Sequence, residues 1–414
     1  MAFKLRPREV TKEDEKKLCR NYTRLLKKND SNTIKVISKL FLELMCLYFS
    51  NPKSKLKKIF FPVIIANLIE QGSINSVIEE YQNKKKLYSE SYTCRILRQL
   101  DEEAGLEISR IFRKILFKIL KRIGLKNKGY CIAIDITAKP FYGNKNLCMV
   151  KGTKKKAGTN FAMQYLTASI VEEGVRFNLL CIPISSTTLI DRKLNEMILE
   201  IEKTVSIKLL YLDRGFANKK YCRIIKSLKY KFIMPITKNR KLCEIERSIK
   251  EQSSIDDESY TLSELDYIFY EKESKEYQES VKLLALHEDD HIFFFITNIY
   301  NLESTNYYGL IESYRYRFGI ETNYRVDNIF CALTSSIRAS MRYLLMQISL
   351  IVQDLWTLAN FILHSPEKRQ PREYLKGNYS IKEIILARVA SIGFIWRPII
   401  GAIQFKRKME RILG

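Results

Sequence analysis

The segment Cys131-Ile-Ala-Ile-Asp135 decides the fold, because it is a short apolar run that ends in an acid. A later segment, Lys208-Leu-Leu-Tyr-Leu-Asp213, repeats the same pattern. Short apolar runs without glycine or proline are typical of buried strands. The sequence therefore predicts two buried strands, with Asp135 and Asp213 at their carboxyl ends.

The segments around these two strands alternate between strand-like and helix-like patterns. Two β-rich runs, at residues 165–171 and 175–183, flank the turn Glu172-Glu-Gly174 and predict a hairpin. Residues 191–205 and 218–230 have helical periodicity, and residues 231–236 are strand-like. This order predicts an α/β fold in which a ribonuclease H-like mixed sheet is flanked by helices. Ligands in such sheets bind beyond the carboxyl ends of the strands, where we expect both aspartates.

The rest of the chain divides by composition. Residues 1–128 are predicted to form an all-α, DNA-binding domain, and residues 129–364 the sheet domain. Residues 237–290 are rich in charge and serine, with short alternating runs, and predict a β-rich insertion. Residues 365–414 predict a basic helical tail. His287 and His291 precede and follow a polar turn, which predicts a hairpin rather than a metal site.

A helix-turn-helix is one interpretation of residues 76–100. Ser76-Val-Ile-Glu79 is a capping box, and a basic turn separates it from a second helix that carries Arg95 and Arg98. That second helix would enter the major groove and bring both arginines to DNA. An ordinary helical hairpin explains the same pattern, and both interpretations remain open.

The charge favours a polyanionic partner. Lys and Arg number 71 against 46 Asp and Glu, a formal net charge of +25. Each phosphate that a cation neutralises releases counterions, which favours binding to nucleic acid. The loop Lys151-Gly-Thr-Lys-Lys-Lys156 is a candidate DNA clamp through Lys151, Lys154, Lys155 and Lys156, and a solvated hairpin tip is the alternative.

Other classes are disfavoured. The nine cysteines form no Cys-x-x-Cys pair and sit mostly in apolar runs, which predicts buried thiols in a reducing compartment. No signal peptide is expected from the charged N-terminus. The apolar stretch 343–363 contains Gln347, Gln353 and Asp354, so we expect a buried helix rather than a membrane span.

The segment Tyr314-Arg-Tyr-Arg-Phe-Gly-Ile-Glu321 places Tyr314, Arg317 and Glu321 at positions i, i+3 and i+7. On a helix these three side chains share one face. Two strand-end aspartates and a helical glutamate suit two divalent metal ions, either Mg²⁺ or Mn²⁺. Arg317 would grip a phosphate through its guanidinium, and Tyr314 would stack on a base or sugar or bond a phosphate.

These residues resemble a family of insertion-sequence DDE transposases. The family signature is Tyr, two residues, Arg, three residues, Glu, six residues, Lys, and this chain matches it at Tyr314, Arg317 and Glu321. The family motifs around the second aspartate and before the glutamate helix match Asp213-Arg-Gly-Phe216 and Thr297-Asn298-Ile299. The signature lysine is replaced by Asn328, and Arg325 or Arg338 is the candidate to take its role in DNA contact.

The resemblance implies that Asp135, Asp213 and Glu321 bind the metals and catalyse two reactions. The first is DNA cleavage at the ends of the element, and the second joins the freed 3′ hydroxyl to target DNA. It further implies double-stranded DNA partners, a homodimer that pairs two ends, and a cytoplasmic, nucleoid-associated prokaryotic protein. A plain metal-dependent nuclease of the same fold and a catalytically inactive DNA-binding regulator are the alternatives.

Overall fold

A computed structural model describes residues 11–27, 36–37, 40, 43, 95, 102–125, 128–172, 176–185, 187–253, 260–269, 279–288, 291–318, 320, 334 and 336–363. The predicted helix-turn-helix, apart from Arg95, and the predicted C-terminal tail lie outside these residues.

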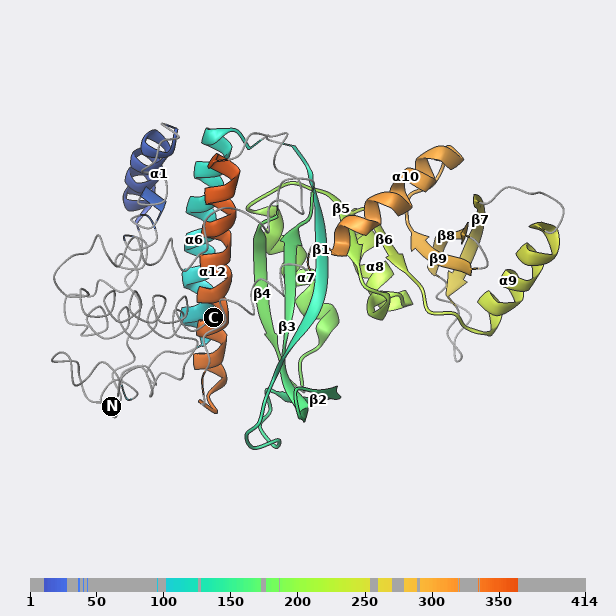
Figure 1. Cartoon of the computed structure of the whole chain (residues 1–414), viewed down its shortest axis with the longest axis horizontal. Helices are drawn as coiled ribbons and strands as arrows, with labels where there is room; N and C mark the ends of the chain where they lie inside the picture. Colours follow the sequence, from blue (N-terminus) through green and yellow to red (C-terminus); the bar gives the residue numbers. More distant parts are fainter. Residues whose placement is uncertain are drawn as a thin grey trace, which may run out of the picture.

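Nine strands of the described residues form one mixed sheet (Figure 1). The strands are β1 (Tyr130–Pro140), β2 (Val150–Lys156), β3 (Thr159–Ile170), β4 (Asn178–Ile184), β5 (Ile207–Leu212), β6 (Phe232–Pro235), β7 (Tyr260–Phe269), β8 (Glu279–Glu288) and β9 (His291–Thr297). Their order across the sheet is β2-β3-β1-β5-β6-β9-β8-β7, and β4 pairs with β3 on the same edge as β2. β1 pairs in parallel with β5, and β5 with β6, whereas the other pairings among the described strands are antiparallel.

The described helices cover both faces of this sheet. They are α1 (Lys12–Leu26), α6 (Glu102–Ile123), α7 (Ile190–Glu202), α8 (Lys219–Ser227), α9 (Arg240–Ser253), α10 (Ser304–Tyr314) and α12 (Ala339–Leu363), with short 3₁₀ turns η1 (Arg214–Phe216) and η2 (Arg315–Arg317). The mixed α/β architecture that the sequence predicts is confirmed at this level.

Alternation along β1 and β5 separates two cores, because successive strand side chains point to opposite faces. Ile134 and Leu212 belong to the larger core, which α1, α6, α7, α8 and α12 complete. Ala133 and Tyr211 belong to a second core, which α10 covers. Asp135 lies two residues after Ala133, and Asp213 lies two residues after Tyr211. Both aspartates are therefore on the sheet face that α10 covers.

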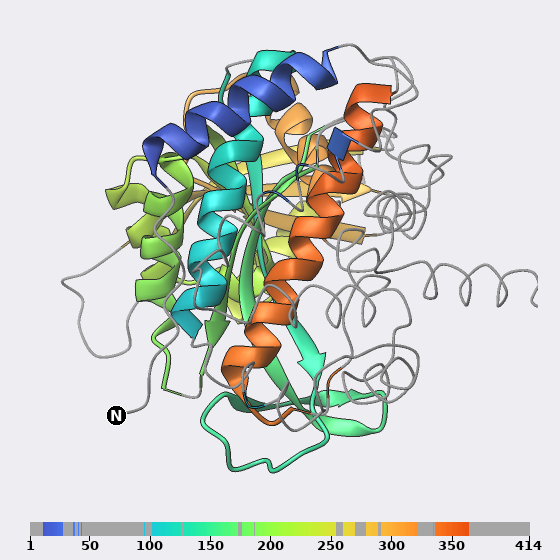
Figure 2. The ribbon, with the colours of Figure 1, turned by 90° about the vertical axis from the view of Figure 1, so that its left-hand side faces the viewer.

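The predicted domain boundary at residue 128 does not separate α6 from the sheet. α6 lies beside α12, and both helices pack against β4. Figure 2 shows α1 crossing the outer side of α6. Apolar residues of α6, such as Phe112 and Leu116, are buried in the same core as the strands, so α6 packs as part of the sheet's core.

The insertion 237–290 is only partly the β-rich segment that the sequence predicts. Its strands β7 and β8 extend the sheet, but they follow α9, a helix that the sequence analysis misses. Asn239 begins this helix by accepting the backbone N–H of Leu242 at 3.0 Å. The hairpin prediction at His287–His291 is confirmed, since β8 pairs with β9 as far as Glu288 opposite His291.

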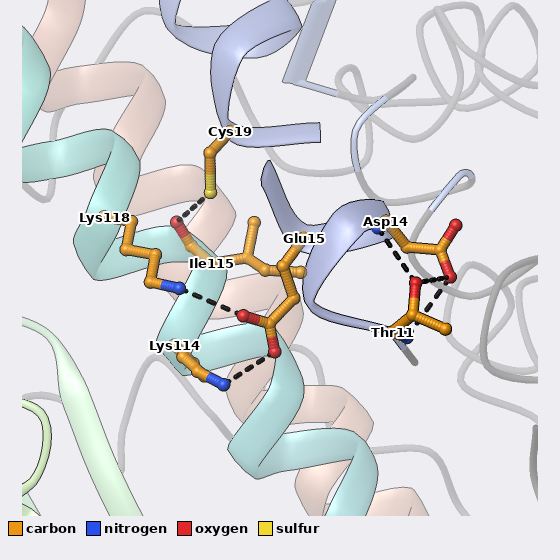
Figure 3. A network of polar contacts seen from close by, with 7 residues as sticks. All are labelled: Thr11, Asp14, Glu15, Cys19, Lys114, Ile115 and Lys118. Carbon is orange, nitrogen blue, oxygen red and sulfur yellow. Dashed lines mark hydrogen bonds and ion pairs between the residues drawn. The ribbon is translucent and has the colours of Figure 1, made fainter. Parts of the chain in front are cut away.

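α1 is held on α6 by a buried carboxylate (Figure 3). Thr11 and Asp14 form a capping box that starts α1. One turn later, Glu15 accepts from Lys114 at 2.7 Å and from Lys118 at 3.0 Å. Burial alone would raise the pKa of Glu15, but the two lysines outweigh burial and lower it. The folded state therefore favours the ionised form.

Glu15→Gln is expected to weaken this attachment by about 1 kcal/mol, because each lysine is half exposed and its ion pair is screened. A lowered pKa means that the stabilisation is present above pH 4.5 and is lost as the pH falls below that value. Urea unfolding at pH 7 and pH 4 measures both effects. Glu13→Gln, an exposed change in the same helix turn, is the control and should leave stability unchanged.

Candidate active site beside β1 and the end of β5

Asp135 and Asp213 lie next to each other across two parallel strands. The last paired residues of β1 and β5 are Ile134 and Leu212, so the two aspartates are the next positions in the same register. Asp213 has an extended backbone (φ −76°, ψ 161°) and continues the direction of β5. Adjacent strands are about 4.8 Å apart, so the two carboxylates rise from neighbouring positions on one face. Asp135 does not end its strand as predicted, because β1 continues antiparallel to β3 as far as Pro140.

The backbone around Asp135 is fixed by its neighbour on β3. Asp135 lies opposite Thr167, whose hydroxyl donates to the Asp135 carbonyl at 3.2 Å. One carboxylate oxygen of Asp135, Oδ1, accepts the backbone N–H of Ile136 at 2.7 Å. The side chain is partly exposed. A carboxylate in this position is held in place and remains open to solvent on one side.

Asp213 is positioned by the turn that follows it. The Asp213 carbonyl accepts the backbone N–H of Phe216 at 2.9 Å, which closes the 3₁₀ turn η1. Phe216 is buried and packs edge-on against Tyr221 of α8, with ring centroids 5.3 Å apart. The predicted motif Asp213-Arg-Gly-Phe216 is therefore an acid anchored by an aromatic residue three positions later.

Arg317 approaches this pair from the face under α10. Its Nη2 lies 3.8 Å from Oδ1 of Asp213, and the Arg317 residue is 6% exposed. The guanidinium carbon lies 5.6 Å from the centre of the Tyr314 ring and 5.1 Å from the centre of the Phe318 ring. Residues i and i+3 eclipse in a 3₁₀ turn, so η2 brings Tyr314 and Arg317 together as the sequence predicts.

Tyr314 has a different role from the one predicted. It is 5% exposed, and its ring packs against Tyr211 and Phe295 at centroid distances of 5.9 Å and 5.5 Å. Its hydroxyl donates to the carbonyl of Leu212 at 2.9 Å. A ring enclosed in this way cannot stack on a base. Tyr314 instead fixes the backbone immediately before Asp213.

Tyr314→Phe is expected to lose about 1 kcal/mol of stability, because the Leu212 carbonyl loses its donor. DNA affinity should stay unchanged, since the hydroxyl is buried. Thermal melting and fluorescence anisotropy with a labelled duplex measure the two quantities. Tyr316→Phe, at an exposed neighbouring tyrosine, is the control. A drop in DNA affinity for Tyr314→Phe with an unchanged melting temperature would show that the Tyr314 hydroxyl contacts DNA directly.

Phe318 is the aromatic residue at this site that the sequence analysis misses. It is 52% exposed and follows Arg317 directly. Phe318 is at i+4 from Tyr314 and so shares the same helix face, but the residues singled out at i, i+3 and i+7 do not include it. An exposed ring beside a guanidinium offers a stacking surface for an unpaired base.

Thr297 and Asn298 fasten the strand that leads into α10. The Thr297 hydroxyl donates to the Phe232 carbonyl at 2.6 Å. The Asn298 side chain donates to the Tyr230 carbonyl at 2.7 Å and accepts the Phe232 N–H at 2.9 Å. This predicted motif therefore joins the end of β9 to the start of β6.

Three predicted site residues lie outside the described residues: Glu321, Arg325 and Arg98. Asn328, which replaces the signature lysine, also lies outside them. Ile320, the residue before Glu321, is fully buried in the core that contains Ala133 and Tyr211. Within the described ranges no group of three or more His, Cys, Asp and Glu is arranged to hold a metal ion. The described part of the candidate site is therefore two carboxylates and one guanidinium.

The lysine segment is a strand rather than the predicted loop. Lys151–Lys156 belongs to β2, and the hairpin turn consists of Ala157 and Gly158, both with positive φ. Lys154 and Lys155 are exposed, whereas partial burial lowers the pKa of Lys151. β2 lies at the far end of β1 from α10 (Figure 1). Lys151 is opposite Ala162 and Asp135 is opposite Thr167, which separates them by five positions of β3, about 17 Å.

Three other predictions concern the chain away from this site. Arg95 is helical and exposed, which agrees with both interpretations of residues 76–100. Across the described residues, no helix is long and apolar enough to span a bilayer. Cys19, Cys181 and Cys222 are buried as predicted, but Cys148 and Cys243 are exposed, since neither sits in a long apolar run.

Comparisons with known proteins give little further guidance. No protein-family model matches the chain, and no curated protein does. Among solved structures, the chain is similar to a piggyBac transposase in a synaptic complex with hairpin DNA. The TM-score is 0.46 and the identity 10%, over 83% of this chain and 74% of that one. A similarity at this level leaves the fold family and the activity to be argued from the geometry of the site.

Proposed function

We propose that this protein is a DNA transposase of the DDE type, which cuts DNA and joins the freed end to a target. The observation that carries the proposal is that Asp135 and Asp213 each directly follow the last pair of the parallel strands β1 and β5, with the Arg317 guanidinium 3.8 Å from Asp213. Two acids and a buried cation on one sheet face suit a phosphodiester and the cations that accompany it.

The strand order supports a ribonuclease H-like catalytic domain. β4, β3 and β1 are antiparallel neighbours, and β5 and β6 continue from β1 in parallel. The first acid is on the central strand β1 and the second follows its parallel neighbour, which is the arrangement expected from the sequence. β7, β8 and β9 then extend the sheet and return the chain to α10.

The donor set suits two Mg²⁺ or Mn²⁺ ions. Hard divalent cations prefer carboxylate oxygens and retain several waters, so few protein ligands are needed. Asp135 would serve both ions, and Asp213 and Glu321 would each complete one. The buried Ile320 supports this assignment for Glu321, since it belongs to the same core as the strands that carry the aspartates. When bound, such a pair of ions neutralises charge at the phosphate and activates the attacking oxygen.

The chain's own residues would position the DNA. Arg317 would hold a nonbridging phosphate oxygen with its planar guanidinium, and Phe318 would stack on an unpaired base at the cut. Lys154 and Lys155, which lie further from Asp135 along the sheet than Lys151 does, would contact flanking duplex rather than the cut phosphate. The formal net charge of +25 favours the same partner. A homodimer would bring two element ends together.

The test is strand transfer by the purified full chain. The protein is incubated with a labelled duplex carrying the terminal repeat that flanks its gene, with plasmid DNA and Mg²⁺. Labelled plasmid is the expected product. Nicking of the duplex without joining would favour the nuclease, and binding without either reaction would favour the regulator. A duplex with a scrambled terminal repeat is the control and should not be joined.

A further inference from the structure

The ion pair between Arg317 and Asp213 has a consequence for how metal and DNA bind. The Arg317 residue is 6% exposed, and the side chain of Asp213 is 39% exposed. A buried guanidinium is costly unless an anion compensates its charge. The partly exposed carboxylate of Asp213 provides negative charge next to the buried guanidinium of Arg317.

The same carboxylate is required for a second purpose. If the proposed function is right, Asp213 ligates a divalent cation, and Arg317 holds a phosphate. While Arg317 neutralises Asp213, the metal ion binds this carboxylate less tightly, because a guanidinium and a divalent cation at one carboxylate repel each other. Arg317 in turn attracts a phosphate less strongly while Asp213 neutralises it. The rings of Tyr314 and Phe318 hold Arg317 close to Asp213 in the DNA-free protein.

We infer that Arg317 has a placeholder role: its guanidinium neutralises the Asp213 carboxylate in the DNA-free protein and leaves it when DNA binds. This inference rests on the proposed function and concerns the order of its binding steps. A DNA phosphate draws the guanidinium away and leaves Asp213 free for the metal ion. A metal ion at Asp213 likewise frees Arg317 for phosphate. Metal and DNA then raise each other's affinity by the same factor, as linkage requires.

The first measurement is Mn²⁺ titration of the DNA-free protein by calorimetry. Arg317→Gln should bind Mn²⁺ more tightly than wild type, within the 5- to 150-fold range that is roughly typical of coupled sites. Arg315→Gln is the matched control. Arg315 is in the same turn but is exposed and pairs with Glu288 and Glu312, so its loss should leave Mn²⁺ affinity unchanged.

Asp135→Asn separates failure of this inference from failure of the proposed function. Loss of Mn²⁺ binding in Asp135→Asn, with equal affinity in wild type and Arg317→Gln, would overturn the placeholder role and leave the metal site intact. Equal Mn²⁺ binding by wild type and Asp135→Asn would overturn the proposed metal site itself. Circular dichroism of each variant establishes that it is folded.

A second measurement uses wild type alone, so it does not depend on any variant folding. DNA affinity is measured by fluorescence anisotropy with Ca²⁺ or with K⁺ at matched ionic strength, because Ca²⁺ binds carboxylates and the match removes the general salt effect. Ca²⁺ should raise the affinity by about fivefold or more. Equal or weaker affinity in Ca²⁺ would overturn the inference.

Discussion

Asp135→Asn is expected to abolish strand transfer while the protein stays folded and binds DNA. The change keeps the size of the side chain and the contact to Ile136 N–H, but it removes the negative charge that two cations would share. Losing several kcal/mol of transition-state stabilisation lowers the rate about a thousandfold or more. Initial rates of joining in Mg²⁺, compared with thermal melting and duplex affinity, measure the three properties separately.

Asp266→Asn is the control for this substitution. Asp266 is on β7, far across the sheet from β1, and its side chain is 72% exposed. The control removes one carboxylate from the same sheet and should leave the joining rate unchanged. A variant at Asp135 that joins DNA at the wild-type rate would refute the assignment of the catalytic acids.

The neighbouring positions of Asp135 and Asp213 were predictable because they follow from local pattern. Each acid comes directly after an apolar run, and parallel strands in one sheet bring their carboxyl ends to one edge. The strand register adds a detail that the sequence does not contain. Ile134 pairs with Leu212, so Asp135 and Asp213 are the next residues at the same height along the two strands. The strand boundaries of β5 and β6 were also close to those expected, since their apolar runs are short and sharply bounded.

The parts that the sequence analysis missed depend on long-range packing. β2 carries four lysines and a glycine, and only pairing with β3 makes this segment a strand. Tyr314 was expected at the DNA surface because it shares a helix face with Arg317 and Glu321, but Tyr211 and Phe295 enclose it from other strands. Side-chain exposure of this kind is decided by contacts far apart in the chain, which periodicity does not report.

A buried polar network behind the sheet is the second place where a large effect is expected. Arg113 of α6 donates through Nε to the Asn178 carbonyl of β4 at 3.1 Å. Asp354 of α12 accepts from the backbone N–H of Asn178 at 2.8 Å and from its side-chain amide at 3.1 Å. Asn178 therefore ties two helices to the edge of the sheet (Figure 1).

The charge state of Asp354 depends on pH within this network. Burial raises the pKa of Asp354 to about 7, although Arg113 and the Asn178 donors oppose the shift. Its Oδ2 is buried without a hydrogen-bond partner among the described residues, which also favours the neutral acid. A folded pKa above the unfolded value means that stability is fully present below pH 3.8 and is lost as the pH rises through about 7.

Arg113→Met is expected to cost about 3 kcal/mol at pH 8, because it leaves the ionised Asp354 buried without its counter-charge. The cost should be smaller at pH 5, where Asp354 takes up a proton and no buried charge remains. Asp354→Asn keeps an oxygen acceptor for Asn178 and should flatten the pH dependence of stability between pH 5 and pH 8. Urea unfolding of the three proteins at both pH values measures these differences. If Arg113→Met lost the same stability at pH 5 as at pH 8, the arginine would contribute through its packing and hydrogen bonds rather than through its charge on Asp354.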